Sequence, residues 1–343
     1  SDTEQFYQDA FSYTTQQLDG LISSGTEIDW QQCGMLQLAH NDRELQRWQT
    51  LKERGLASSL IQLLDKTTTS KLAGITCDYP SSYFPAAGFI NPASFCRALL
   101  ANSNYDLIHS TDAIELSRDT SSKSWEVLDG QKNNIAAAGT VIICNGKDLN
   151  QFEQTDFISL SNVLGQTSVG KSSANKLKCV IGHEGYLTPS YEGGNVFGAT
   201  FERDYSSTEI NPEADQRNIS QLQQYLPVMA ETLVSVASGH AAVRPATSDR
   251  YPFAGGVPSL DDFKQDYVEL RHGRPSHKYP TAKYEDGLFV LGGLGSRGLT
   301  TSAYCANLLS KLVDNQADTM QGELLNTLHP ARFLIRQLKR GLL

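Results

Sequence analysis

The chain has 343 residues, of which 39% are apolar and 20% are charged, and its formal net charge is −9. A chain of this size and composition buries one large core or two smaller ones, which excludes an intrinsically disordered protein. Its longest apolar stretch, residues 136–144, is far shorter than the roughly 20 residues of a membrane span, and the net charge excludes nucleic-acid binding by the surface as a whole.

The chain is expected to open with a helix, because apolar residues between positions 3 and 22 recur at helical spacing. A strand-like run follows over residues 34–38. Asn91 has the character of an N-cap and Pro92 suits the first helical position, so a second helix is predicted through Leu100.

Short strands are then expected to lead into an apolar one. The short strands are predicted at residues 107–108, 113–116 and 125–128, and the apolar run covers residues 140–144 and closes on Gly146. Three short antiparallel strands followed by such a run are common in flavin domains, where a glycine lets the chain pass close to a dinucleotide. A turn glycine without a ligand explains Gly146 equally well.

The middle of the chain alternates as an antiparallel sheet does, and we interpret it as the substrate sheet. Strand candidates separated by turn signals lie at residues 162–168, 179–182, 185–189 and 196–201. Two helices are predicted next, over residues 215–225 and after Pro227, and a strand over residues 240–244 follows them.

A glycine-rich loop near the C-terminus is the strongest local signal. The apolar run 288–291 leads into Gly293, Gly295 and Gly298, and then into a helix beginning near Thr300. A strand, a glycine turn and a helix N-terminus together suit an anionic cofactor group. The spacing satisfies G-x-G-x-x-G, but that fingerprint belongs in the first turn of a βαβ unit, so we interpret the loop as a second cofactor contact. A tight turn without a ligand is the alternative.

The six cysteines are scattered, without a Cys-x-x-Cys pair or a histidine at metal-ligand spacing. We therefore expect reduced thiols and no metal site. The chain also opens without a signal-peptide pattern, which favours a cytoplasmic protein with no membrane partner.

Two basic stretches are candidate RNA contacts despite the negative net charge. The first contains Arg271, Arg274 and Lys278, and the second contains Arg332, Arg336, Lys339 and Arg340. A solvated charged face remains an alternative for both stretches.

Several motifs, read in order, resemble the D-amino-acid oxidase and glycine oxidase superfamily of FAD enzymes. They are Gly185 to Pro189, Gly198 to Thr200, Val243 to Pro252 and the Gly293-to-Gly298 loop. Within that superfamily, residues 294–299 followed by residues 328–333 are similar to the C-terminal oxidoreductase domain of the MnmC family of bifunctional tRNA-modifying enzymes.

The resemblance implies a mixed α/β fold in which an FAD domain is interleaved with an antiparallel-sheet substrate domain. The FAD domain would comprise residues 1–25, 86–160 and 266–343, and the substrate domain residues 26–85 and 161–265. The βαβ unit that opens such domains is not found in the chain, nor is the methyltransferase domain that uses S-adenosylmethionine in the MnmC family. A truncated C-terminal part, with FAD retention in question, is therefore expected.

The family's chemistry implies a substrate and a product. Its oxidoreductase domain removes the carboxymethyl group from 5-carboxymethylaminomethyl-uridine at the tRNA wobble position and releases glyoxylate. The attacked side chain is an N-substituted glycine, so FAD accepts a hydride and the protein orients the C–H bond and holds the carboxylate.

By the same resemblance, Arg244 matches the carboxylate-binding arginine and Tyr186 the active-site tyrosine, and Arg297 or Ser296 reaches flavin or substrate. An ion pair with Asp249 remains open for Arg244, and an ordinary strand tyrosine for Tyr186. Cofactor contacts are expected at Gly146, Gly165, Gly293, Gly295, Ser296, Arg297, Gly298, Leu299 and Thr300. Isolated histidines, such as His183, His240 and His329, are expected to be structural.

Two other functions remain compatible with the residues. A soluble glycine- or sarcosine-type amino-acid oxidase shares Tyr186 and Arg244 but has no use for the basic tail. An inactive fragment without flavin, which at most docks RNA, is the non-enzymatic alternative.

Overall fold

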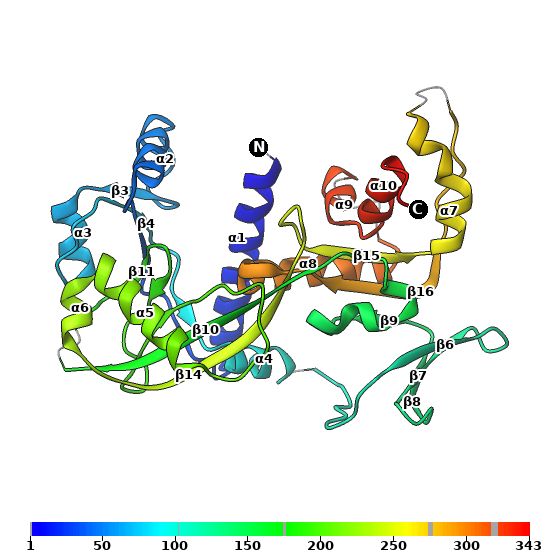
Figure 1. Ribbon diagram of the computed structural model, residues 1–343, viewed down its shortest axis with the longest axis horizontal. Coiled ribbons are helices and arrows are strands. Elements are labelled where there is room, and N and C mark those ends of the chain that lie inside the picture. Colours follow the sequence, from blue (N-terminus) through cyan, green and yellow to red (C-terminus); the bar gives the residue numbers. More distant parts are fainter. Residues whose placement is uncertain (1, 102, 174–175, 274–276, 317–321) are drawn as a thin grey trace. The chain divides into compact units, whose positions relative to one another are not determined.

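The computed structural model describes residues 2–101, 103–173, 176–273, 277–316 and 322–343 of a mixed α/β fold. The chain forms two compact units, each assembled from more than one stretch of sequence. Unit 1 comprises residues 1–17, 104–162 and 244–343, and unit 2 comprises residues 18–103 and 163–243. Figure 1 shows the elements of both units.

The unit boundaries differ from the predicted domain ranges. Residues 244–265, expected with the substrate domain, belong to unit 1. The physical reason is strand pairing, since β15 (Phe253–Pro258) lies antiparallel to β16 (Tyr284–Gly292) in the sheet of unit 1.

Unit 1 contains two three-stranded sheets, ordered β15-β16-β9 and β6-β7-β8. Its other strands are β6 (Glu115–Asp119), β7 (Ser124–Leu128), β8 (Asn134–Ala138) and β9 (Val141–Ile143). Its helices are the first part of α1 (Asp2–Ser23), α7 (Leu260–Tyr267), α8 (Gly298–Val313), α9 (Gly322–Leu328) and α10 (Ala331–Lys339), with 3₁₀ turns η1 (Gly146–Gln151), η2 (Glu153–Thr155), η3 (Val268–His272) and η4 (Gly295–Arg297).

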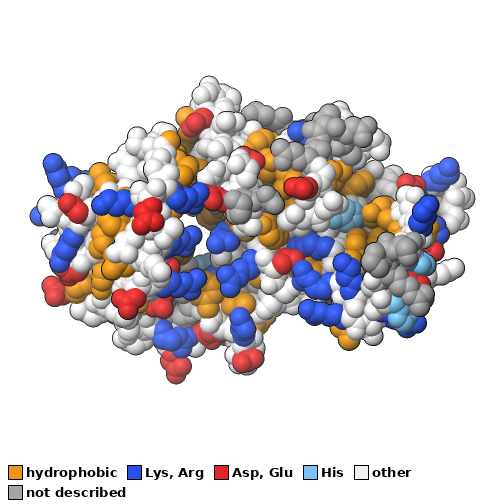
Figure 2. Space-filling view, turned by 90° about the horizontal axis from the view of Figure 1, so that it is seen from above, with side chains coloured by type: hydrophobic (Ala, Val, Ile, Leu, Met, Phe, Trp, Pro, Cys, Tyr) orange, Lys and Arg blue, Asp and Glu red, His pale blue; other side chains and the backbone are white. Residues whose placement is uncertain are grey.

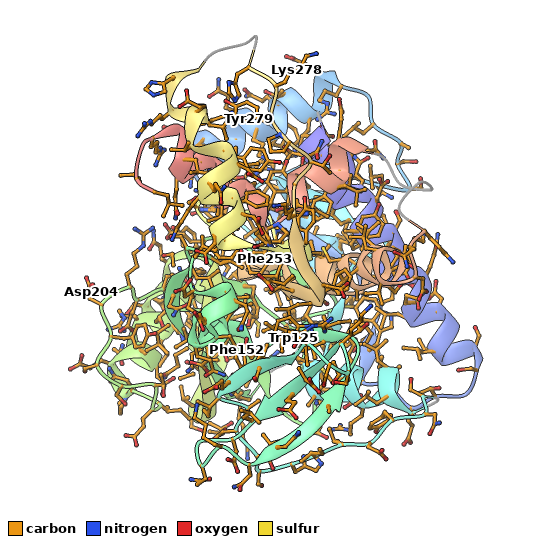
Figure 3. All side chains as sticks on the ribbon, turned by 90° about the vertical axis from the view of Figure 1, so that its right-hand side faces the viewer. Trp125, Phe152, Asp204, Phe253, Lys278 and Tyr279 are labelled. Atoms are coloured by element: carbon orange, nitrogen blue, oxygen red, sulfur yellow. The ribbon has the colours of Figure 1, made fainter. Side chains whose placement is uncertain are left out.

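The apolar run of β16 is buried on both faces. Leu288 and Val290 belong to one core cluster, while Phe289 and Leu291 pack in the other with residues of α8. Successive residues of a strand point to opposite faces, so a strand covered on both sides is apolar throughout. Figure 3 labels Trp125, Phe152 and Phe253, which meet in the first of these clusters.

Two expectations for unit 1 were wrong. Residues 107–108 form no strand, and the third strand beside β6 and β7 is β8. Alanine and asparagine have low β-propensity, so the sequence did not predict β8 as a strand. Its pairing with β7 stabilises the strand in spite of that low propensity. The apolar run over residues 140–144 is of the type expected for a fully buried strand, but it is not buried throughout, since Ile142 of β9 is 45% exposed.

Unit 2 is built on an eight-stranded sheet ordered β14-β10-β13-β12-β11-β2-β4-β3, beside a small sheet of β1 and β5. Its strands are β1 (Trp30–Gln31), β2 (Met35–Leu38), β3 (Gln62–Leu64), β4 (Ser81–Phe84), β5 (Phe89–Ile90), β10 (Ser161–Ser172), β11 (Val180–Gly182), β12 (Tyr186–Leu187), β13 (Asn195–Gly198) and β14 (Leu233–Ala246). The last residues of β14 continue into unit 1.

The four strands predicted for the middle of the chain are present as neighbours, and β10, β13, β12 and β11 pair antiparallel in that order. Leu222 of α5, Leu226 between the helices and Met229 of α6 belong to the core cluster that contains Leu36 and Ile181 of the sheet. The helices of unit 2 are α2 (Asp42–Glu53), α3 (Lys66–Ala73), α4 (Pro92–Leu100), α5 (Pro212–Tyr225) and α6 (Pro227–Thr232).

The predicted start of α4 is confirmed. The Asn91 side chain accepts hydrogen bonds from the amides of Ala93 and Ser94, with Pro92 at the first helical position. Within the described ranges, helices long and apolar enough to cross a membrane are absent.

Candidate functional site

The glycine loop has the predicted strand-turn-helix form. Gly293 and Gly295 have φ angles of 64° and 55°, in the left-handed region that side-chain-bearing residues avoid. Gly298 has a helical φ of −56° and begins α8. No side chain caps this helix, so its first amide groups and the positive end of its dipole suit an anionic group.

Packing accounts for Gly293 before any ligand is considered. A Cβ atom at this position would lie 2.6 Å from Cγ2 of Thr247 and 2.8 Å from the ring of Phe253. These distances are far shorter than van der Waals contacts. The sequence could not distinguish this packing requirement from a close approach by a cofactor.

Gly146 differs from Gly293 in its surroundings. It has a φ of 66° and follows the end of β9, and among the described residues no atom outside its own neighbours lies within 4 Å of the position a Cβ would take. Strands β9 and β16 are parallel, with Val141 opposite Leu288. Gly146 and Gly293 therefore follow the carboxyl ends of adjacent parallel strands, the edge at which open α/β sheets bind ligands.

Arg244 lies on β14, and the end of this strand contacts the glycine loop. Ala246, two residues later, forms an isolated antiparallel bridge with Leu294. The Cβ atom of Ala246 is 3.6 Å from the position a Cβ of Gly295 would take. Because residues two apart on a strand share a face, the Arg244 side chain lies on the same face of β14 as Ala246, toward the loop.

The family model for FAD dependent oxidoreductases matches residues 2–312 of the chain. The chain belongs to this family. The "tRNA 5-methylaminomethyl-2-thiouridine biosynthesis bifunctional protein MnmC" of Chromobacterium violaceum is 31% identical over 318 residues, which cover 91% of the chain and 48% of that protein. The corresponding protein of Methylobacillus flagellatus is 33% identical over 313 residues, covering 89% and 47%. The chain thus spans about half the length of these relatives.

Solved structures share the fold at low identity. Glycine oxidase from Bacillus cereus superposes with a TM-score of 0.75 at 17% identity, covering 94% of this chain and 83% of that one. Iminodiacetate oxidase from Chelativorans gives a TM-score of 0.73 at 17% identity, with 95% and 84% covered. Both comparisons support the architecture expected from the sequence.

The residues of this FAD-dependent oxidoreductase fit the cofactor that its family implies. The open space at Gly146, the uncapped N-terminus of α8 and the left-handed glycines offer backbone amides and room to a phosphate-bearing group. Ser296, Arg297 and Leu299 are exposed on the loop, and Gly298 and Thr300 are half-buried. Their predicted cofactor contacts remain proposals.

Asp249, the alternative ion-pair partner of Arg244, pairs with two arginines of the C-terminal helix α10. Arg332 contacts both carboxylate oxygens of Asp249, at 3.0 and 3.2 Å, and Arg336 contacts one at 3.1 Å. Burial opposes ionisation of Asp249, but the hydrogen bonds and charge of Arg332, helped by Thr247 and Tyr251, outweigh it and lower the pKa to about 2. Asp249 therefore holds α10 in place.

The RNA-binding role predicted for Arg332 stays a prediction, and the structure shows this side chain engaged within the protein. Its side chain is 13% exposed and also donates to the carbonyls of Tyr251 and Pro252, at 2.9 and 3.2 Å. Arg336 is more exposed, but it donates to Ser248 and Asp249. Both arginines therefore link α10 to the turn at residues 248–252.

The other predicted RNA contacts lie on the surface of unit 1. Arg271, Lys278, Lys339 and Arg340 are all exposed, whereas Arg274 lies outside the described residues. Arg271 and Lys339, far apart in sequence, line the same hollow.

Arg297 stacks on an aromatic ring from the first helix. Its guanidinium carbon lies 4.6 Å from the ring centroid of Tyr7, and the hydroxyl of Thr14 donates to the carbonyl of Thr300 at 2.9 Å. Sequence reasoning missed Tyr7 and Thr14, because their roles depend on α1 packing against α8.

Tyr186 and Gly165 belong to unit 2. Tyr186 is half-buried on β12 opposite Gly198, and Gly165 is buried within β10. Their predicted catalytic and cofactor roles stay predictions.

Two of the histidines expected to be structural are hydrogen-bonded through Nδ1, and of these His183 is buried and His329 is half-buried. Nδ1 of His183 accepts from the amide of Gly185, and Nδ1 of His329 accepts from the amide of Ala331. Burial, aided by His40 for His183 and by Arg332 for His329, lowers the pKa of each to about 4. Both imidazoles are therefore neutral at pH 7. His240 is exposed on β14.

Proposed function

We propose that this FAD-dependent oxidoreductase removes the carboxymethyl group from 5-carboxymethylaminomethyl(-2-thio)uridine at the wobble position of tRNA and releases glyoxylate. The observation that carries the proposal is the position of Arg244 on the strand face that meets the glycine loop through Ala246 and Leu294. A carboxylate held there would lie beside the loop that we assign to the cofactor.

Support for an N-substituted glycine as substrate comes from chemistry and from the relatives. Glycine and iminodiacetate, for which the two oxidases with the same fold are named, both contain an N–CH2–COO⁻ group. The MnmC relatives are named for a tRNA uridine that carries a methylaminomethyl group. The carboxymethylaminomethyl side chain joins these two features.

Arg244 is assigned to binding and orientation. Its guanidinium can hold a carboxylate by two parallel hydrogen bonds, which fixes the adjacent CH2 group. FAD, when bound, accepts the hydride that leaves this carbon. The resulting C=N bond of the substrate adds water and splits into glyoxylate and the aminomethyl base. Tyr186 keeps the role that the resemblance implies, which is to offer its hydroxyl to a substrate carboxylate.

The function is tested with protein loaded with FAD, after its visible absorption spectrum shows that flavin stays with the chain through gel filtration. Glyoxylate release from tRNA carrying the modified base is the expected result. Arg244→Lys keeps the charge but loses the two-pronged geometry, so it should raise KM and lower kcat. Arg244→Gln should lose more activity than Arg244→Lys.

Three outcomes would contradict the proposal. Loaded protein that is inert toward modified tRNA would refute the reaction. Hydrogen peroxide formed from free glycine or sarcosine, with tRNA inert, would indicate an amino-acid oxidase. Failure to retain added FAD would indicate a fragment without oxidoreductase activity.

A further inference from the structure

A basic hollow lies in unit 1 between the 3₁₀ turn η3 and the end of α10. Its volume is about 500 Å³, and its lining includes Arg271, His272, His277, Tyr279 and Lys339. Tertiary structure creates this hollow, because α10 packs on η3 and brings together two basic stretches that the sequence separates. Figure 2 shows histidine and basic side chains near the right-hand edge of the surface.

The charge of the hollow opposes that of the whole chain. The described residues that line it include no carboxylate, whereas the formal net charge of the chain is −9. Nearby acidic groups on α7 have a basic partner of their own, since Lys283 pairs with Asp262 and with Asp266. Glu269 lies on η3 but is not among the lining residues, so the charged side chains that line the hollow are basic and suit an anionic ligand.

One wall of the hollow is aromatic and firmly anchored. The ring of Tyr279 stacks on Tyr267 of α7 at 5.5 Å with an interplanar angle of 26°, and His277 lies 4.5 Å from Tyr279. Tyr267 packs in turn against the buried ring of Phe263 at 4.9 Å and donates its hydroxyl to the carbonyl of Pro280. Figure 3 labels Tyr279 beside α7 and Lys278 next to it.

The opposite wall is held by α10. Arg332 ties the start of this helix to Asp249 and to the carbonyls of Tyr251 and Pro252. Lys339, in the last turn of the same helix, lines the hollow together with Arg271, and its side chain is exposed. The backbone on both sides of the hollow is thus held by contacts within the protein, while the exposed side chains of Arg271 and Lys339 are available to a ligand.

We propose that this hollow docks the phosphate backbone of RNA, with Arg271 and Lys339 contacting phosphates and the Tyr279–His277 wall offering a face to a base. Exposed cations interleaved with aromatic rings are what unpaired RNA binds, through charge and through stacking. A flat anionic membrane surface does not enter a concave hollow, which favours RNA over lipid. The identity of that RNA as tRNA rests on the function proposed above.

The test measures binding of the full chain to a fluorescent, unmodified tRNA anticodon stem-loop across a range of salt concentrations. The test variant is Arg271→Ala/Lys339→Ala. The matched control is Lys71→Ala/Lys123→Ala, which removes the same charge from exposed residues on other elements. Each lost phosphate contact should reduce the magnitude of the slope of log K against log salt by about 1. The slope of the test variant should therefore be smaller by about 2, and that of the control should be almost unchanged.

A second variant examines the aromatic wall. Tyr279→Leu keeps the charge, so it should weaken binding by a similar factor at every salt concentration and leave the salt slope unchanged. Circular dichroism and the thermal midpoint of each variant show whether it is folded. Since Arg271 and Lys339 are exposed, we expect their replacement to leave both measurements unchanged.

Equal loss of slope in test and control variants, or a wild-type chain that does not bind RNA at low salt, would overturn the proposal. Binding to phosphatidylserine vesicles in preference to the stem-loop would also overturn it. Docking and catalysis fail separately, because this assay needs neither FAD nor a modified base. RNA binding without glyoxylate release refutes the reaction alone, and glyoxylate release that survives without binding in the hollow refutes the docking surface alone.

Discussion

Replacing Gly293 by alanine tests whether the glycine loop is shaped by protein packing. The new Cβ would approach Thr247 and Phe253 to 2.6 and 2.8 Å, and the φ of 64° disfavours any side chain. The left-handed conformation costs an alanine about 1–2 kcal/mol. Overpacking adds about 1–3 kcal/mol, so the free energy of unfolding should fall by about 2–5 kcal/mol.

Gly146→Ala is the matched control, because its φ of 66° is nearly the same but its Cβ would meet nothing within 4 Å. It should cost only the conformational part, about 1–2 kcal/mol. Urea unfolding of FAD-free protein, followed by tryptophan fluorescence, measures the free energy of unfolding of both alanine variants. Trp30 and Trp48, which lie in unit 2, are replaced by phenylalanine so that buried Trp125 reports unit 1 alone.

Equal destabilisation by the two alanines would refute the packing explanation for Gly293. Thr247→Ser gives a further check, because it removes Cγ2 and keeps the hydroxyl that donates to the carbonyl of Tyr251. In the Thr247→Ser protein, Gly293→Ala should lower the free energy of unfolding by less than it does in the wild-type protein. Flavin retention is expected to respond differently from stability. Gly146→Ala should impair flavin retention more than its small effect on the free energy of unfolding implies.

Two predictions concern titrating groups. Asp249→Asn removes the charge that holds Arg332, so at pH 7 the free energy of unfolding should fall by about 1.5–3 kcal/mol. The folded-state pKa of Asp249 is depressed to about 2, so this stability is present above its unfolded pKa and is lost as pH falls toward 2; an Asn variant with an unchanged acid-unfolding profile would contradict the assignment. For His183 and His329 the folded pKa of about 4 lies below the unfolded value of 6.5. The unfolded chain therefore binds protons first, and stability should decline as pH falls from 6.5 toward 4, an effect that His183→Gln and His329→Gln should each reduce in urea titrations.

Local patterns were sufficient where an element depends on its own residues. The N-cap at Asn91, the turn from β16 into α8 and the four antiparallel strands of unit 2 were all predicted, because capping, glycine placement and alternation are local. The strand β8 was missed, since its alanines have little β-propensity and only pairing with β7 makes it a strand.

The roles of the basic residues show the limit of such reasoning. Arg332 and Lys339 look alike in the sequence, yet Arg332 is 13% exposed and bound to Asp249, whereas Lys339 is exposed beside Arg271. The difference depends on which face of α10 meets the turn at residues 247–252. That face is chosen by burial of Phe333 and Leu334 in the core.

The sequence by itself determined the family, the mixed α/β class and the glycine loop, since each is written in residue types at short spacings. Tertiary structure alone decided that Gly293 must be glycine for packing, and that Gly146 has open space around it. It also decided that Arg271 and Lys339 share a hollow. The physical reason is that contact distances depend on how distant segments pack, which no local pattern encodes.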